Sequence, residues 1–158
     1  MFETAEEYLQ EMVSSYKKAD HSVFVTLKYT RTVDVIKNIV DRFIETIGYG
    51  ITALTLDLVN KNKLFEAPET LILQINEVKN AYPENEKLME CIDFVLFLRK
   101  VTRCEYGKCE EFRKNVTMSV TIDGVEYNIK IPVLEEYLEK TKEYIKVIEN
   151  QMKGKPEE

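Results

Sequence analysis

The longest run of regularly spaced apolar residues lies between residues 22 and 60. Its mean step of about 3.67 residues is close to the α-helical period and far from the strand period of two. Its members are Val25, Tyr29, Val33, Ile36, Val40, Phe43, Ile47, Ile51, Leu54 and Leu58. The spacing predicts one very long helical element over residues 22–60. A strand is the alternative at its start, because apolar residues alternate over residues 23–29 in a β-branched stretch.

The length of this element makes a bend or a partner necessary. A helix of about 40 residues would span roughly 60 Å, whereas a compact domain of this size has a diameter of roughly 40 Å. Gly48 and Gly50 are the expected kink, because glycine weakens a helix interior by about 0.5–1 kcal/mol relative to Ala. The alternative is an overhang that packs on a second copy of the chain, which predicts a homodimer.

Shorter helices are marked by their ends. Thr4 followed by Glu7 predicts a capping box and a first helix, with a buried stripe formed by Tyr8, Leu9, Met12, Val13 and Tyr16. Polar residues 20–22 suit a turn and a second N-cap. Residues 60–67 have no periodicity and are expected to form a loop, after which Pro68 would open a helix.

That helix should end at Tyr82 and Pro83, and Asn85 would cap the next one. We expect the next helix to bury a single face formed by Leu88, Ile92, Val95, Leu96 and Val101. Its far end is not defined by the pattern, because Gly107 interrupts the helical signal before Arg113.

The apolar period changes to two over residues 116–131, which predicts a β-hairpin. Asp123-Gly124 fits a two-residue type I′ turn. That turn would place three apolar pairs on one face, which helices must cover: Ile122 with Val125, Val120 with Tyr127, and Met118 with Ile129.

Pro132 then opens a last helix with a face made by Leu134, Leu138, Thr141, Ile145, Ile148 and Met152. The predicted fold class is therefore mostly α: a helical bundle with one very long or kinked central helix, and a single β-hairpin before the C-terminal helix. We expect one helical domain over residues 1–153 and a frayed tail over residues 154–158.

Composition narrows the class of protein. The 158 residues are 44% hydrophobic and 32% charged, which is typical of a charged helical domain with one core. A net charge of -6 argues against a surface coated with nucleic acid. There is no apolar run of membrane-spanning length and no secretory signal, and the three cysteines suit a reducing compartment. We expect a cytoplasmic protein without a membrane partner. Its abundance of Lys, Glu and Ile resembles hyperthermophile proteins.

Few residues suit catalysis or metal binding. His21 is the only histidine, which excludes sites that need two. The spacing of Cys104 and Cys109, with Cys91 upstream, does not match the close pairs of structural zinc sites. Glycine-rich phosphate loops are absent from the sequence. The sequence therefore predicts no catalytic residues, no metal and no cofactor, and it leans away from an enzyme.

The best candidate ligand site is basic. Arg99 and Arg103 are four residues apart and share a helical face, with Lys100 beside them. Two guanidinium groups that converge there could bind an anion, a phosphate or a nucleic acid. Arg31 is a further candidate. The alternative is a solvated surface paired with carboxylates, as for Arg31 with Asp34 three residues later.

A family resemblance adds expectations. Residues 27–37, Leu98-Arg99-Lys100 and residues 133–148 resemble an uncharacterised archaeal helical-bundle family. The order of helices is similar to HEPN domains, which implies a dimer and a nucleotidyltransferase as a protein partner. Active HEPN ribonucleases carry Arg followed four to six residues later by His. No histidine follows Arg99 or Arg103, so the resemblance does not imply ribonuclease activity here.

These observations favour a non-catalytic helical interaction module, HEPN-like and dimeric. The alternative function is a nucleotide- or RNA-binding protein that uses the face of Arg99 and Arg103.

Overall fold

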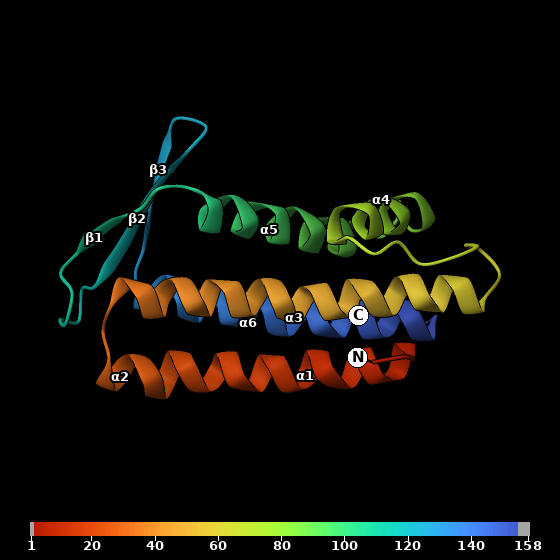
Figure 1. Ribbon diagram of the computed structural model, residues 1–158, viewed down its shortest axis with the longest axis horizontal. Helices are drawn as coiled ribbons and strands as arrows, with labels where there is room; N and C mark the ends of the chain where they lie inside the picture. Colours follow the sequence, from red (N-terminus) through yellow and green to blue (C-terminus); the bar gives the residue numbers. More distant parts are fainter. Residues whose placement is uncertain (1, 155–158) are drawn as a thin grey trace.

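The computed structural model describes residues 2–154, which form a helical bundle with a small β-sheet at one end (Figure 1). Helix α3 (Val33–Asn60) is central and contacts each of the other long helices. Helix α1 (Ala5–His21) packs on one side of it, and α6 (Ile131–Lys153) packs on it as well and contacts both α1 and α5. Helices α4 (Leu71–Ala81) and α5 (Glu86–Arg103) lie across from α1. The predicted fold class is confirmed.

The first helix begins where predicted. Thr4 Oγ1 accepts a hydrogen bond from the Glu7 backbone N–H at 3.1 Å, which caps α1. The predicted turn at residues 20–22 is wrong, because the helix continues through a π-helical turn, η1 (Ser22–Thr26), into α2 (Leu27–Tyr29). Residues 23–29 are therefore helical as predicted, and the alternative of a strand there is wrong.

The long element predicted over residues 22–60 is broken at residues 30–32, where the chain reverses. Thr30 and Thr32 adopt extended backbone, and Thr32 Oγ1 accepts from the Val35 N–H at 3.2 Å to start α3. The kink expected at Gly48 and Gly50 is wrong, since α3 is continuous through both glycines. Helix α3 has 28 residues, or about 42 Å, so it needs no second copy to cover an overhang.

The apolar stripe divides at the same break. All its members from Val33 onward are buried, but Val25 is 39% exposed and Tyr29 80% exposed. Val23 and Leu27 are buried instead and extend the face that α1 begins at Met12 and Ala19. Ala19, Val23 and Leu27 are each four residues apart, so in a regular α-helix of about 3.6 residues per turn they would rotate away from a common face. The wider π-helical turn keeps them on one face.

One glycine of α3 matters for packing. A Cβ at Gly50 would lie 2.7 Å from Ile148 Cδ1 and 2.7 Å from Met12 Sδ, whereas a Cβ at Gly48 would meet nothing within 4 Å. Gly50 therefore lets α1, α3 and α6 approach closely, and Gly48 has no such role.

The ends of the next two helices agree with prediction except at Pro68. Thr70 caps α4, and Pro68 lies in the preceding loop, where its carbonyl accepts from Gln74 Nε2 at 2.9 Å. Helix α4 ends before Tyr82, and Asn85 Oδ1 accepts from the Leu88 N–H at 3.1 Å to cap α5.

The sheet has order β1-β2-β3 and is antiparallel, with β1 (Gly107–Cys109), β2 (Thr117–Ile122) and β3 (Val125–Ile129). All three predicted pairs of the hairpin are confirmed. Positive φ values at Asp123 (51°) and Gly124 (80°) fit the type I′ turn. Strand β1 was not predicted, and Val125 at the end of the apolar face is 51% exposed.

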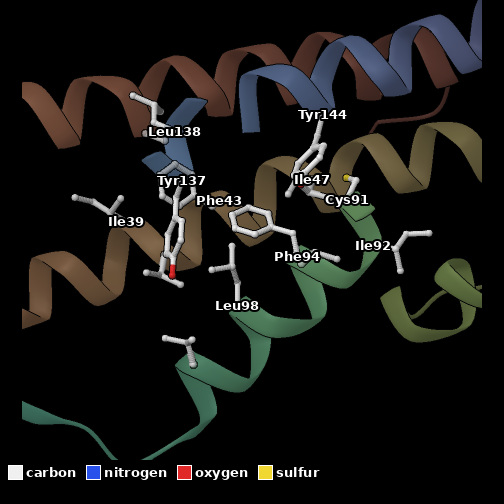
Figure 2. Close-up of a cluster of buried hydrophobic side chains, with 14 of the residues drawn as sticks. Ile39, Phe43, Ile47, Cys91, Ile92, Phe94, Leu98, Tyr137, Leu138 and Tyr144 are labelled. Carbon is white, nitrogen blue, oxygen red and sulfur yellow. The ribbon is translucent and has the colours of Figure 1, made fainter. Parts of the chain in front are cut away.

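The last helix closes the core (Figure 2). Phe94 of α5 packs its ring 5.3 Å from Tyr137 and 5.6 Å from Tyr144 of α6, measured between centroids. The Tyr144 hydroxyl donates to Glu90 Oε2 at 2.8 Å. Gly154 ends α6 with a left-handed φ of 71°. The rest of the predicted tail, residues 155–158, lies outside the described residues.

Candidate anion-binding groove

A hollow of about 510 Å³ lies between α5, the β2–β3 turn and the start of α4. Helix α5 contributes six of its lining residues and the β2–β3 hairpin four. Figure 1 shows the hairpin beside the C-terminal end of α5. We call this hollow the α5 groove. It is lined by Ile72, Asp93, Leu96, Phe97, Arg99, Lys100, Arg103, Ile122, Asp123, Val125 and Tyr127.

The apolar part of the groove comes from α4, α5 and both strands of the β2–β3 hairpin. Phe97 and Tyr127 pack edge to face, with ring centroids 4.9 Å apart. Leu96 was predicted to lie on the buried face of α5, but it is half-buried and lines the groove. The core face of α5 is formed by Leu88, Cys91, Ile92, Val95, Leu98 and Val101. Helix α5 thus carries apolar residues on two sides, because it has the core on one and the groove on the other.

The cationic part of the groove contains three of the four predicted binding residues. Arg99 is half-buried, and Lys100 and Arg103 are exposed. Lys100 Nζ lies 3.5 Å from Asp123 Oδ2 in the hairpin turn. No carboxylate among residues 2–154 lies within ion-pair distance of Arg99 or Arg103. The structure therefore leaves both guanidinium groups available to a ligand.

Arg31 does not line this groove. Its carbonyl accepts a 2.6 Å hydrogen bond from the Phe112 N–H, in the loop between β1 and β2. Its Nε is buried and has no hydrogen-bond partner in the described part of the chain. The expected pair with Asp34 does not form, because Asp34 Oδ1 pairs with Lys108 Nζ at 3.4 Å. The four predicted residues thus belong to two separate places.

The cysteines and the histidine form no common site. Cys91 is fully buried, and burial raises the pKa of its thiol far above the usual value, so the thiol stays protonated. Cys104 Sγ lies 3.8 Å from the Thr121 carbonyl oxygen in a second hollow of about 580 Å³ beside the sheet. Across residues 2–154, His, Cys, Asp and Glu form no group of three that could hold a metal ion.

The β2–β3 hairpin lines one side of the groove, which was not predicted from the sequence. Ile122, Val125 and Tyr127 were placed on an apolar face that helices cover, but the helices cover only part of it. The signal available in the sequence was the extra apolar pair Leu96 and Phe97, which a one-faced helix does not need.

Comparisons with protein-family models, curated proteins and solved structures gave no match. Within the described residues, no helix is both long and apolar enough to cross a membrane. The geometry of the α5 groove is therefore the basis of the functional argument.

Proposed function

We propose that this protein is a non-catalytic binding module and that the α5 groove is its ligand site. The observation that carries the proposal is that Arg99 and Arg103 lie beside an apolar floor and have no ion pair among the described residues. A folded chain gains little from apolar side chains left in a solvent-filled hollow, and such hollows with a few charged groups are the usual form of ligand sites. Guanidinium groups select anions because they offer paired, charge-assisted donors.

The lining supports binding more than catalysis. It contains no His, Cys, Ser or Thr, and its only carboxylates are Asp93 and Asp123. Asp123 is already paired with Lys100. General acid-base catalysis is carried most often by His, and nucleophilic catalysis commonly uses Ser, Cys or Thr, and the groove offers none of these.

A purely structural role of the basic residues must be separated from ligand binding. Lys100 and Arg103 lie in the last turn of α5, where cations favour the helix dipole by about 0.3–1 kcal/mol. This role predicts a change in stability when they are replaced and no change in affinity for a ligand. The proposed function predicts a loss of affinity.

Anilinonaphthalene sulfonate, an anion with an apolar aromatic body, is a suitable probe. We expect its fluorescence titration to give a dissociation constant at least about tenfold weaker for Arg99→Ala/Arg103→Ala than for the wild type, as loss of charge-assisted hydrogen bonds implies. Arg113→Ala/Lys114→Ala is the matched control, because it removes the same charge outside the groove. Circular dichroism would check folding of both variants. Equal affinities for all three proteins would rule out the groove as the site.

A nucleotide- or RNA-binding protein is the second candidate. It is favoured by the aromatic rings of Phe97 and Tyr127 in the groove that holds the arginines, because bases stack on aromatic side chains. We expect binding of a single-stranded RNA to weaken with salt, and the slope to fall in Arg99→Ala/Arg103→Ala. A salt slope that these substitutions leave unchanged would remove this candidate.

The HEPN-like character, the dimer and the nucleotidyltransferase partner stay predictions. The length argument for the dimer has lost its premise, since the chain reverses at residues 30–32. Phe24, Tyr29 and Phe112 are among the exposed large apolar side chains that a second copy would cover. Light scattering after size exclusion decides the question, and a monomer at micromolar concentration would contradict the dimer.

A further inference from the structure

We infer that the ligand of the α5 groove is a single-headed amphiphilic anion, a carboxylate or phosphate monoester carried on an apolar chain. This inference rests on the proposed function, since it names the chemical class that the groove selects. It follows from the size of the groove, the polarity of its floor and the arrangement of its charges.

The size favours a small molecule over a protein partner. Eleven residues line the groove, and its volume is about 510 Å³. Stable protein interfaces use roughly 20–30 residues a side, whereas pockets for small ligands measure roughly 300–1,000 Å³. The groove fits the second class.

The floor favours an apolar chain over a nucleobase. Six of its lining residues are apolar or aromatic, and among these only Tyr127 offers an uncharged polar group. The lining has no Asn, Gln, Ser or Thr to pair with the donors and acceptors of a base. A base whose polar edge lay against this apolar floor would lose hydrogen bonds to water that the floor does not replace, at a cost of about 1–3 kcal/mol for each buried group. An alkyl chain has no such groups to satisfy.

The charges favour one anionic head. Arg99 and Arg103 are on one helical face four residues apart, so both can donate to a single carboxylate or phosphate. Asp93 lies at the other end of the α5 wall, ten residues before Arg103, a distance of about 15 Å along the helix. A polyanion that extends along the wall would be repelled by the Asp93 carboxylate, whereas an uncharged chain would not be repelled.

The groove therefore has a direction. The cationic residues lie at the C-terminal end of α5, and Ile72 with Leu96 continues the apolar floor toward its middle. The head of the ligand binds at Arg99 and Arg103, and its chain lies against Leu96, Phe97 and Ile72. Val125 borders the chain on the hairpin side, and the Tyr127 ring, which packs on Phe97, forms part of the same apolar floor.

Isothermal titration with decanoate and with decyl phosphate tests this assignment and distinguishes the two heads. We expect saturable binding of at least one of them at one site per chain. Acetate and inorganic phosphate, which lack the chain, and octyl glucoside, which lacks the charge, should bind at least about tenfold more weakly. Arg99→Ala/Arg103→Ala should weaken the binding of the amphiphile at least about tenfold, and Arg113→Ala/Lys114→Ala should not.

A second variant tests the apolar part. Val125 is half-exposed, so Val125→Glu is expected to fold and to place a carboxylate beside the chain. It should weaken decanoate binding, whereas Phe65→Glu, a matched change at a residue outside the groove that is 95% exposed, should leave it unchanged. Weakening by both variants alike would contradict the placement of the chain.

The outcomes separate this inference from the proposed function. If AMP, an RNA oligomer or an acidic peptide bound in an arginine-dependent way and the amphiphiles did not, the amphiphile would be wrong and the binding groove would stand. If no anion, including anilinonaphthalene sulfonate, showed dependence on Arg99 and Arg103, both would be overturned.

Discussion

The two sides of α5 differ in what occupies them. On its inner side Leu98 and Ile92 are fully buried against the bundle, and Phe94 packs on two tyrosines of α6 (Figure 2). On its outer side Leu96 and Phe97 are also apolar, but they border a hollow with two arginines that have no ion pair within residues 2–154. Burial on the inner side is complete within the chain, so it specifies the fold. The outer side is incomplete, which is the physical reason to assign it to a ligand.

The largest effect is expected from truncating the inner side. Leu98→Ala removes a fully buried side chain and should lower the free energy of unfolding by about 2–5 kcal/mol, through lost burial and a cavity. Leu96→Ala, on the half-buried outer side, should cost clearly less. Urea denaturation of both variants measures the difference. Equal losses would show that the outer side belongs to the folding core as much as the inner one.

The glycines of α3 provide a second contrast between close packing and open space. Gly50→Ala should lower the free energy of unfolding by about 1–3 kcal/mol, because its Cβ would overlap Met12 and Ile148, which are themselves fully buried. Gly48→Ala should raise it by up to about 1 kcal/mol, because alanine favours the helix and nothing lies in its way. Thermal melts of the two variants should therefore shift in opposite directions. An upward shift for Gly50→Ala would contradict the close approach at Gly50.

The buried apolar stripe of α3 was predictable because its helical spacing was a sufficient signal by itself. From Val33 to Leu58 the helical period and burial against the bundle coincide, so spacing alone identified the helix and its buried face. The break before it was missed because Val25 and Tyr29 happen to continue the spacing into Val33. The usable signal was local: Thr32 is an N-cap residue, and Asp34 follows in the first turn.

The groove was predictable on one side only. Arg99 and Arg103 share a face by helical geometry alone, and the structure leaves both without an ion pair in the described chain. The hairpin wall and Ile72 reach the groove through tertiary packing, which spacing does not encode. Strand β1 was missed for a similar reason, since its three residues have no period of their own and are held by pairing with β2.

Alkaline pH should lower the free energy of unfolding through Tyr137 of α6, which packs on Phe94 at the inner side of α5. Burial, with smaller contributions from Glu136 and Tyr127, raises the pKa of Tyr137 to about 12 from 10.0. Above pH 10 the unfolded phenol loses its proton while the folded one keeps it, so the unfolded state binds fewer protons and stability falls as pH rises to about 12. Burial also raises the pKa of Tyr144, in the same direction.

Tyr137→Phe should therefore lose less stability than the wild type between pH 10 and pH 12, as measured by urea midpoints across that range. Tyr29→Phe is the control, because Tyr29 is exposed in the fold and its ring stays in solvent on unfolding. If Tyr137→Phe and the wild type lost stability equally over this range, burial of the phenol would not be the source of the alkaline dependence.

The smallest effect is expected at the border of the groove, where Lys100 meets Asp123. Both side chains are largely exposed, and such pairs contribute about 0–1 kcal/mol. Asp123→Asn keeps a residue type that tolerates the positive φ of this turn, so the free energy of unfolding should change by no more than about 0.5 kcal/mol. The same change frees Lys100 and should tighten binding of anilinonaphthalene sulfonate by a few-fold. Asp123→Ala should cost more stability, because alanine tolerates this backbone less well. If the Asn and Ala variants were equally destabilised, the Lys100–Asp123 ion pair would be stabilising the hairpin. The outer side of α5 would then contribute to folding as well as to ligand binding.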